Sequence, residues 1–280
     1  MLRPIRRDIY HSSGQGFYVF RNFLGPDVAT HMQRFWSDLD PMLIHRTLPS
    51  EGIKALFNGC PDYSYGKQHG DHRGFLNFFW NHPADEVSYA VAMQVQWLRN
   101  RVMGKAPQAD IFPLNGRAVS YRAVISMRGK VVTRPHRDFD GDDWIRDPSK
   151  LQATLFLCTP GADYTGDGFT LETNGGDSVR FGHEVPVACG DLVLWRYSNH
   201  HSVLNVESSG DQCGFIRLLF PIEDIAAQPI PAETISTEPL PEDGGAPSQR
   251  PFWEAFLLRV KATPLGQRVL VPIWHRVRTH

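Results

Sequence analysis

The chain has 280 residues, of which 41% are hydrophobic and 21% charged, an ordinary globular composition that excludes a disordered or fibrous protein. Its 29 Lys and Arg residues against 30 Asp and Glu residues give a formal net charge of -1, so no strong field favours binding to nucleic acid or to an anionic membrane. The length allows one large domain or two smaller ones.

The sequence shows neither a clear targeting segment nor a paired-cysteine motif. No apolar run approaches the roughly 18 to 20 residues that span a bilayer, and residues 1–13 hold no hydrophobic stretch of signal-peptide length. We therefore expect a cytoplasmic protein that is not bound to a membrane. The cysteines form no CxxC pair and are far apart, which predicts reduced, mostly buried thiols at Cys60, Cys158, Cys189 and Cys213.

The N-terminal third predicts a strand, a helix, a loop and a second helix. Residues 16–20 are typical of a short strand, and apolar side chains at helical spacing predict a helix over 28–39. Over 41–83, Gly, Pro, Asn and His alternate with aromatic residues, which indicates a long structured loop or lid. The clearest helix is predicted over 83–103, where a Pro-Ala-Asp-Glu start precedes apolar residues on one face, namely Val87, Val91, Val95, Leu98 and Val102.

From residue 115 onward the sequence consists of short runs rich in Val, Leu, Phe and Thr, separated by turn residues. Such runs, without helices between them, are typical of an antiparallel sandwich or jelly roll. After Pro221, a Pro- and Glu-rich stretch to Pro251 predicts an exposed strap, and 252–260 predicts a helix. The predicted strands are 118–127, 151–158, 168–173, 178–181, 191–197 and 215–220.

His136 and Asp138 form an H-x-D triplet at the end of a strand-like segment. A metal centre of two histidines and one carboxylate needs three ligands on one face of an octahedron. Two of them can come from one strand, because residues i and i+2 point the same way, and the third must come from a strand folded back beside it. His201, which lies 65 residues after His136 at another strand end, supplies that third ligand.

Two simpler interpretations stand beside this one. His136 and Asp138 can be a surface pair in the charged run 134–143. A second triplet, His69-Gly70-Asp71, arises without any flanking strand pattern, which shows that chance alone produces such spacing. The His-x-Asp triplet therefore indicates a metal site only when the surrounding sequence also supports one.

That context resembles the Fe(II)- and 2-oxoglutarate-dependent oxygenase superfamily. The N-terminal segment 16–24, followed by a helix, is similar to the opening of the phytanoyl-CoA hydroxylase-like branch. The resemblance covers roughly residues 14–40 and 115–222. The matching features in the second of these regions are His136-x-Asp138, the Gly-Asp-Gly-Phe-Thr-Leu run at 166–171, the Gly-Asp-Leu-Val-Leu run at 190–194, and His201-x-Val203-x-x-Val206.

The resemblance implies a mainly β protein with flanking helices, built on a double-stranded β-helix of the jelly-roll or cupin-like type. We expect a single catalytic domain over residues 1–280. Its parts would be an N-terminal helical and lid part (14–114), a jelly-roll core (115–222), and a C-terminal strap and helix (223–280).

It also implies that His136, Asp138 and His201 bind Fe(II), with 2-oxoglutarate and O2 as cosubstrates. Such enzymes convert 2-oxoglutarate to succinate and CO2 while they oxidise, most often hydroxylate, an unactivated C–H bond. The family pattern selects His201 over the adjacent His200, because neighbouring strand residues face opposite sides. The carboxylate of Asp138 favours hydroxylation, desaturation or ring chemistry over halogenation, since halogenating relatives carry a small residue there.

The far carboxylate of 2-oxoglutarate needs a cation, and an arginine fork suits it. Arg217 is the candidate, because a charge inside the apolar run 215–220 is costly without an anionic partner. It follows His201 by 16 residues, more than the family usually has, and the turn at 208–211 can absorb the extra length. Arg122 is the fallback, and a salt bridge at a sheet edge is the alternative for both arginines.

The substrate is expected to be a small molecule. A peptide or protein hydroxylase of the same superfamily and a non-catalytic jelly-roll binding module are the alternatives. Aromatic residues of the predicted lid can wall the active site or belong to the core (Tyr63, Tyr65, Phe75, Phe78, Phe79 and Trp80). Four cations near the triplet favour either an anionic substrate or a solvated face (Arg128, Lys130, Arg134 and Arg137).

Overall fold

The computed structural model describes residues 2–40, 64–80, 83–111, 117–138, 149–209 and 212–224. No helix within these ranges is long and apolar enough to cross a membrane. The elements in chain order are α1 (Leu2–Tyr10), β1 (Phe17–Phe20), α2 (Pro26–Asp38), β2 (Ser64–His69), β3 (His72–Phe78), α3 (Glu86–Met103), β4 (Arg117–Ser126), β5 (Arg128–His136), β6 (Leu151–Phe156), β7 (Gly168–Glu172), β8 (Ser178–Arg180), β9 (Leu192–Arg196), β10 (His201–Glu207), β11 (Phe215–Leu219) and β12 (Ile222–Asp224).

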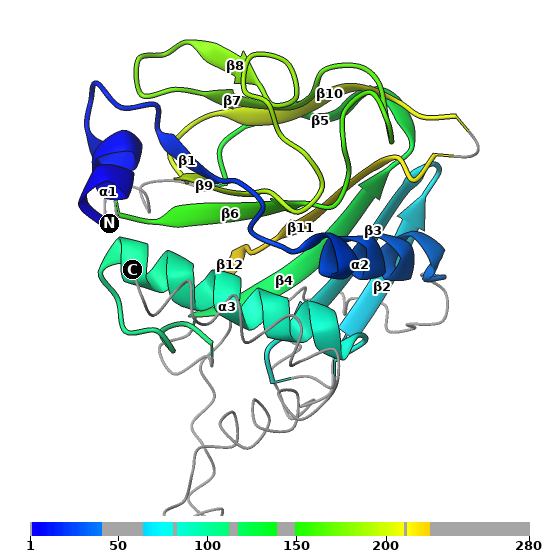
Figure 1. The fold of residues 1–280 in the computed structure, drawn as a ribbon, viewed down its shortest axis with the longest axis horizontal. Helices are drawn as coiled ribbons and strands as arrows, with labels where there is room; N and C mark the ends of the chain where they lie inside the picture. The colour runs from blue at the N-terminus through cyan, green and yellow to red at the C-terminus, as the bar shows by residue number, and fades with distance from the viewer. Residues whose placement is uncertain are drawn as a thin grey trace, which may run out of the picture. The chain divides into compact units, whose positions relative to one another are not determined.

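The strands form two antiparallel sheets, a large one and a small one (Figure 1). The large sheet has the order β1-β9-β6-β11-β4-β3-β2, with β12 also paired to β4, and the small sheet has the order β5-β10-β7-β8. Strands that are far apart in sequence are therefore neighbours in both sheets, as in a jelly roll. The expected class, a mainly β double-stranded β-helix with flanking helices, is confirmed.

Apolar side chains from both sheets pack together between them. Because side chains alternate along a strand, Phe169 and Leu171 of β7 and Val193 and Trp195 of β9 all point into this layer. Burial of each of these side chains contributes about 1.5–3 kcal/mol, so the two sheets form a stable frame for the ends of their strands. The layer includes Phe17, Phe156, Phe169, Leu171, Val193, Trp195, Val203, Val206 and Phe215.

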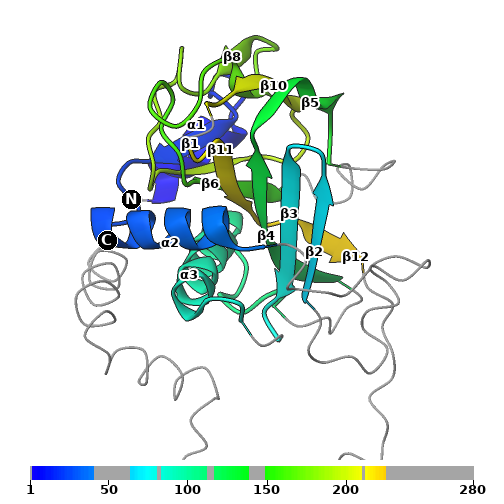
Figure 2. The same ribbon diagram turned by 90° about the vertical axis from the view of Figure 1, so that its right-hand side faces the viewer.

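Helices α2 and α3 cover the outer face of the large sheet (Figure 2). Trp36 of α2 packs against Phe75 of β3 with ring centroids 5.7 Å apart. From α3, the buried Arg99 donates a hydrogen bond to the carbonyl oxygen of Leu151 at the start of β6. The Asp85 carboxylate accepts the backbone N–H of Ser88 at 2.8 Å and so caps the start of α3.

The predicted first strand, the two helices predicted over 28–39 and 83–103, and the core strands are present. Three segments differ from the predictions. Residues 2–10 form α1, part of the predicted loop forms the β2–β3 hairpin, and the start of the predicted strap forms β12, paired with β4. The rest of that loop (41–63), most of the strap and the predicted helix at 252–260 lie outside the described residues.

The hairpin escaped prediction because its second strand is covered on both faces. Residues 74–78 of β3 are all buried, and Phe75 packs against Trp36 of α2, so no polar and apolar alternation marks the strand. Phe75, Phe78 and Phe79 are therefore core residues, as the simpler interpretation of the aromatic cluster held. Among the cysteines within the described residues, Cys158 is buried and Cys189 and Cys213 are half-buried, and all three are free.

Candidate metal centre

Two neighbouring strands of the small sheet place the two predicted histidines side by side. β10 pairs with β5 in a register that puts His201 directly opposite His136, and their ring centroids are 4.2 Å apart. His201 is 8% exposed and packs against Trp195 of β9, with ring centroids 4.5 Å apart. His201 is therefore buried beside the layer between the sheets, whereas the side chain of His136 is 40% exposed at its border.

Asp138 follows the end of β5 by two residues and turns its carboxylate toward both rings. Its Oδ1 atom lies 3.6 Å from Nε2 of His136 and 3.4 Å from Nε2 of His201. One ligand atom from each of the three side chains lies within 4.8 Å of the others. Three ligands on one face of an octahedral ion, each about 2.1 Å from it, lie about 3 Å apart, so this donor set fits a single transition-metal ion after small adjustments.

The hydrogen bonds of His136 fix which of its nitrogens faces the centre. Nδ1 of His136 lies 2.7 Å from the carbonyl oxygen of Arg134 and, since a carbonyl only accepts, must carry the proton. The lone pair of Nε2 is then left for a metal, in the arrangement that metal-binding histidines commonly have. In His201, Nε2 faces the carboxylate, while Nδ1 is buried without a hydrogen-bond partner among the described residues.

Electrostatics in the metal-free site favour an ionised carboxylate. Burial raises the pKa of Asp138, but hydrogen bonds from His136, His201 and Gln152 outweigh it and hold that pKa well below its usual range. The hydrogen bond with Asp138 raises the pKa of His136. Burial lowers the pKa of His201 despite the same carboxylate. A site with an anionic oxygen and a neutral buried imidazole is suited to a divalent cation.

The other histidines that the sequence singled out lie elsewhere. His200 turns away from the cluster, and its Nδ1 pairs with Oε2 of Glu172 at 2.8 Å on the exposed side of the sheet. His69 ends β2 and Asp71 lies in the turn that follows, in the hairpin at the edge of the large sheet. Of the histidines considered in the sequence, the structure therefore brings together His136 and His201, with Asp138 between them.

Arg217 lies in the same interior layer as the cluster. It is only 6% exposed, and its guanidinium lies 5.5 Å from the ring centre of Phe169 and 5.3 Å from that of Phe215. Burial lowers the pKa of Arg217 to about 10, against the opposing effect of the Asp138 carboxylate. The described residues supply no hydrogen bond or ion pair to this guanidinium, and its Nε is a buried donor without an acceptor.

Sequence reasoning missed two neutral polar side chains, Tyr164 near Arg217 and Gln152 beside Asp138. The hydroxyl of Tyr164 is buried without a hydrogen-bond partner among the described residues, and its ring centroid is 4.9 Å from that of Phe215. Arg217 acts on the hydroxyl electrostatically and opposes the burial that raises the pKa of Tyr164. Gln152 of β6 donates a hydrogen bond to Oδ2 of Asp138 at 3.1 Å. Neither residue belongs to a motif.

The remaining predicted cations have different surroundings. Arg122 of β4 pairs with Glu223 of β12 at 3.2 Å and is 30% exposed, so its charge already has an anionic partner. Arg128 pairs with Glu207 at 3.5 Å, where both side chains are exposed. Lys130, Arg134 and Arg137 are exposed, as expected for a solvated face.

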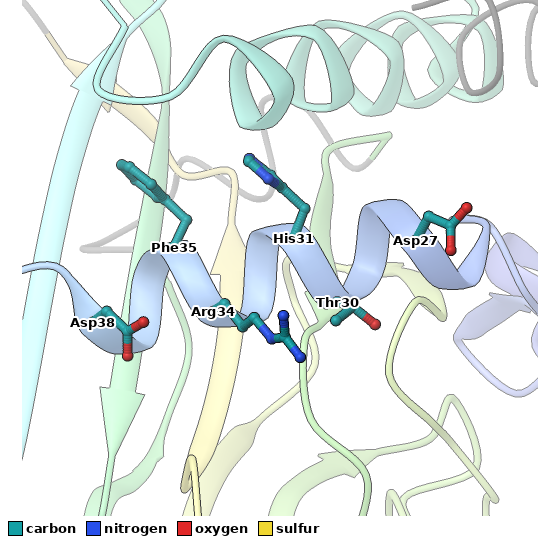
Figure 3. A pocket seen from close by; sticks show the side chains of 6 residues that line it. All are labelled: Asp27, Thr30, His31, Arg34, Phe35 and Asp38. Atoms are coloured by element: carbon teal, nitrogen blue, oxygen red, sulfur yellow. The ribbon is translucent and has the colours of Figure 1, made fainter. Parts of the chain in front are cut away.

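A separate surface hollow of about 440 Å³ lies along α2 (Figure 3). It mixes acidic and basic side chains, and its histidine is paired with Asp85 at 3.0 Å, so its charges favour no single class of ligand. No residue of the His-Asp-His cluster lines it. The lining residues are Asp27, Thr30, His31, Arg34, Phe35 and Asp38.

No protein-family model and no curated protein matches the chain. Among solved structures, it is similar to a prolyl-4-hydroxylase from Pseudomonas putida, with 16% identity, a TM-score of 0.48, and coverage of 79% of this chain and 97% of that one. It is also similar to AviO1 from Streptomyces viridochromogenes, with 14% identity, a TM-score of 0.47, and coverage of 82% of this chain and 97% of that one. A third similar structure is the non-heme α-ketoglutarate-dependent epimerase SnoN from nogalamycin biosynthesis, with 13% identity, a TM-score of 0.47, and coverage of 88% of this chain and 92% of that one. The chemistry available to this chain therefore follows from its own side chains.

Proposed function

We propose that this chain is an Fe(II)- and 2-oxoglutarate-dependent oxygenase that hydroxylates an unactivated C–H bond of a small molecule. The observation that carries the proposal is the convergence of Nε2 of His136, Oδ1 of Asp138 and Nε2 of His201 in the layer that also holds the unpaired guanidinium of Arg217. The pattern at 16–24, which forms β1 and leads into α2, supports the phytanoyl-CoA hydroxylase-like branch of that superfamily.

The cluster has the donor set that suits Fe(II) in this role. Two imidazole nitrogens and one carboxylate oxygen occupy three positions of an octahedral ion and leave three for cosubstrates. When bound, the metal with 2-oxoglutarate and O2 supplies the oxidising chemistry, with release of succinate and CO2. His136, Asp138 and His201 are the residues that would bind it, and the carboxylate of Asp138 favours oxygen insertion over halogenation.

Arg217 and Tyr164 are the residues we assign to the distal carboxylate of 2-oxoglutarate. A buried guanidinium without an anion is costly, and a dicarboxylate that pairs with it recovers that cost. The Tyr164 hydroxyl offers a second donor that no described residue uses. Arg122 is the weaker candidate, because Glu223 already neutralises it.

Aromatic side chains line the His201 side of the cluster. Trp195 and Phe169 pack against His201, with ring centroids 4.5 Å and 6.2 Å away, and the indole N–H of Trp195 donates to the Thr154 hydroxyl at 3.1 Å. The indole is therefore fixed in place beside the metal ligand. An apolar wall on this side of the cluster strengthens the electrostatic interactions of His201.

The proposal is tested by anaerobic titration of the purified protein with Fe(II) and 2-oxoglutarate. The wild type should develop a weak visible charge-transfer band. Asp138→Ala should lose the band, and Arg217→Met should need far more 2-oxoglutarate to form it. His200→Ala, just before β10 and paired with the partly exposed Glu172, serves as the matched control and should keep the band.

Two results would count against an oxygenase. The absence of the band in the wild type would remove the metal and cosubstrate assignment altogether. A band without succinate formation in air, with any small molecule or peptide supplied, would favour a binding module. Peptide-dependent succinate formation would move the substrate from a small molecule to a polypeptide.

A further inference from the structure

Gln152 is a buried amide that contacts the candidate metal ligand Asp138 from the opposite sheet. It lies on β6, where it is paired with Trp195 of β9, and is 2% exposed. Its Nε2 donates to Oδ2 of Asp138 at 3.1 Å and lies 3.4 Å from the hydroxyl oxygen of Tyr197. A residue of the large sheet therefore holds the side chain of Asp138, which lies just beyond β5 of the small sheet.

The orientation of this amide is fixed by the backbone. Its Oε1 accepts the N–H of Ala153 at 3.0 Å and the N–H of Phe220 at 3.2 Å. Backbone N–H groups only donate, so the atom that they contact must be the oxygen. The nitrogen must then face Asp138, and a flipped amide would break all of these contacts at once.

The two oxygens of Asp138 consequently have different partners. Oδ1 faces both imidazoles, whereas Oδ2 accepts the hydrogen bond from Gln152. Asp138 lies two residues beyond β5, so the ladder hydrogen bonds of the sheet do not fix its side chain. Gln152 is the one described residue outside the cluster that an observed hydrogen bond ties to this carboxylate.

We propose that Gln152 is a positioning residue that holds Oδ2 of Asp138, so that the carboxylate offers only Oδ1 to the metal. The inference rests on the proposed function, because it requires that the cluster binds a metal. A carboxylate that binds through one oxygen would leave three coordination positions available to cosubstrates. A carboxylate that binds through both oxygens would take one of these three and leave two. Residues that hold metal ligands in this way commonly change metal affinity about 10- to 100-fold when they are replaced.

The test compares metal binding by Gln152→Met and Gln152→Leu with the wild type. Methionine keeps the length of the side chain without a hydrogen bond, and leucine provides a second, branched replacement should the first fold poorly. Gln94→Met is the matched control, because Gln94 is also a buried glutamine but lies on α3. Mn(II) affinity is measured by electron paramagnetic resonance without 2-oxoglutarate, and the Co(II) absorption spectrum reports coordination. Circular dichroism and a melting curve give the folded fraction.

Both Gln152 variants should bind Mn(II) about 10- to 100-fold more weakly than the wild type and should show an altered Co(II) spectrum, while Gln94→Met matches the wild type. Wild-type affinity and an unchanged spectrum in folded Gln152 variants would overturn the inference while leaving the metal site intact. The same loss in Gln94→Met, or a loss explained by the folded fraction, would also overturn it. If the wild type binds neither ion, the proposed function fails, and this inference fails with it.

Discussion

At the scale of single residues, two adjacent histidines at the start of β10, His201 in the strand and His200 just before it, provide the sharpest test of the site. His201 faces the interior and Asp138, whereas His200 pairs with Glu172 on the exposed side. His201→Ala should abolish turnover, because it removes a metal ligand. His200→Ala should retain turnover and cost at most about 1 kcal/mol of unfolding free energy, the upper range for an exposed ion pair. Succinate formation and chemical denaturation measure the two effects, and the reverse result would mean that the ligand is His200.

A second residue-scale prediction concerns His136 in the metal-free protein. Its pKa is raised first by the hydrogen bond with Asp138, so Asp138→Asn should lower it. A raised folded pKa stabilises the protein fully below the unfolded value of about 6.5, and this contribution is lost as pH rises through the folded pKa. NMR titration of the imidazole resonance measures the change, with Asp167→Asn as a distant carboxylate control. An unmoved His136 titration in Asp138→Asn would contradict the observed contact.

Residue type and spacing were enough to predict that three side chains lie together and that a fourth is a buried charge. His136, Asp138 and His201 carry metal-binding side chains at strand ends, and Arg217 is a charge in an apolar strand. Gln152 and Tyr164 could not be predicted, because neutral polar residues in β segments are common. Their importance comes from neighbours on other strands, namely the carboxylate beyond β5 and the guanidinium on β11.

At the scale of elements, the turn before β7 has little room. Gly166 has a φ of +98°, and an added Cβ would lie 1.4 Å from the carbonyl oxygen of Asn205 on β10. Gly166→Ala should therefore destabilise the protein by well over the roughly 1–2 kcal/mol that a left-handed backbone costs an alanine, because β10 must also move. Gly176→Ala is the control, since its φ is +89° but nothing lies within 4 Å of the added atom. Denaturant unfolding measures the unfolding free energy of both variants. Equal losses would show that the backbone at Asn205 can move aside at little cost.

Elements were predictable where periodicity or capping is strong. α3 is marked by its caps, namely Asp85 at its start and Gly104 in the left-handed region at its end, whereas its buried residues extend around most of the helix and include polar ones. α1 was missed because only Ile5 and Ile9 are buried, and two apolar residues four apart are a weak helical signal. The pairing of β1 with β9 joins segments at opposite ends of the described chain, and such distant pairing is not encoded in local sequence.

At the scale of the whole molecule, the apolar layer between the sheets is complete without an ion. It combines residues of β1, β6, β9 and β11 in the large sheet with residues of β7 and β10 in the small one. The His136, Asp138 and His201 cluster lies at one side of this layer, where the end of β5 and the start of β10 meet. Removal of the metal should therefore leave the fold intact and lower only its stability.

This predicts a metal-dependent melting temperature in a protein whose circular dichroism does not change. Mn(II) at one hundred times its dissociation constant should stabilise the wild type by about 2.7 kcal/mol, which for a domain of this size corresponds to about 5–10 °C in melting temperature. Asp138→Ala should gain almost nothing, and a chelator should reverse the gain in the wild type. Mg(II) should act more weakly, since it prefers oxygen ligands to imidazoles. Equal stabilisation of Asp138→Ala would mean that Mn(II) binds elsewhere, and unfolding by the chelator would mean that the core depends on the ion.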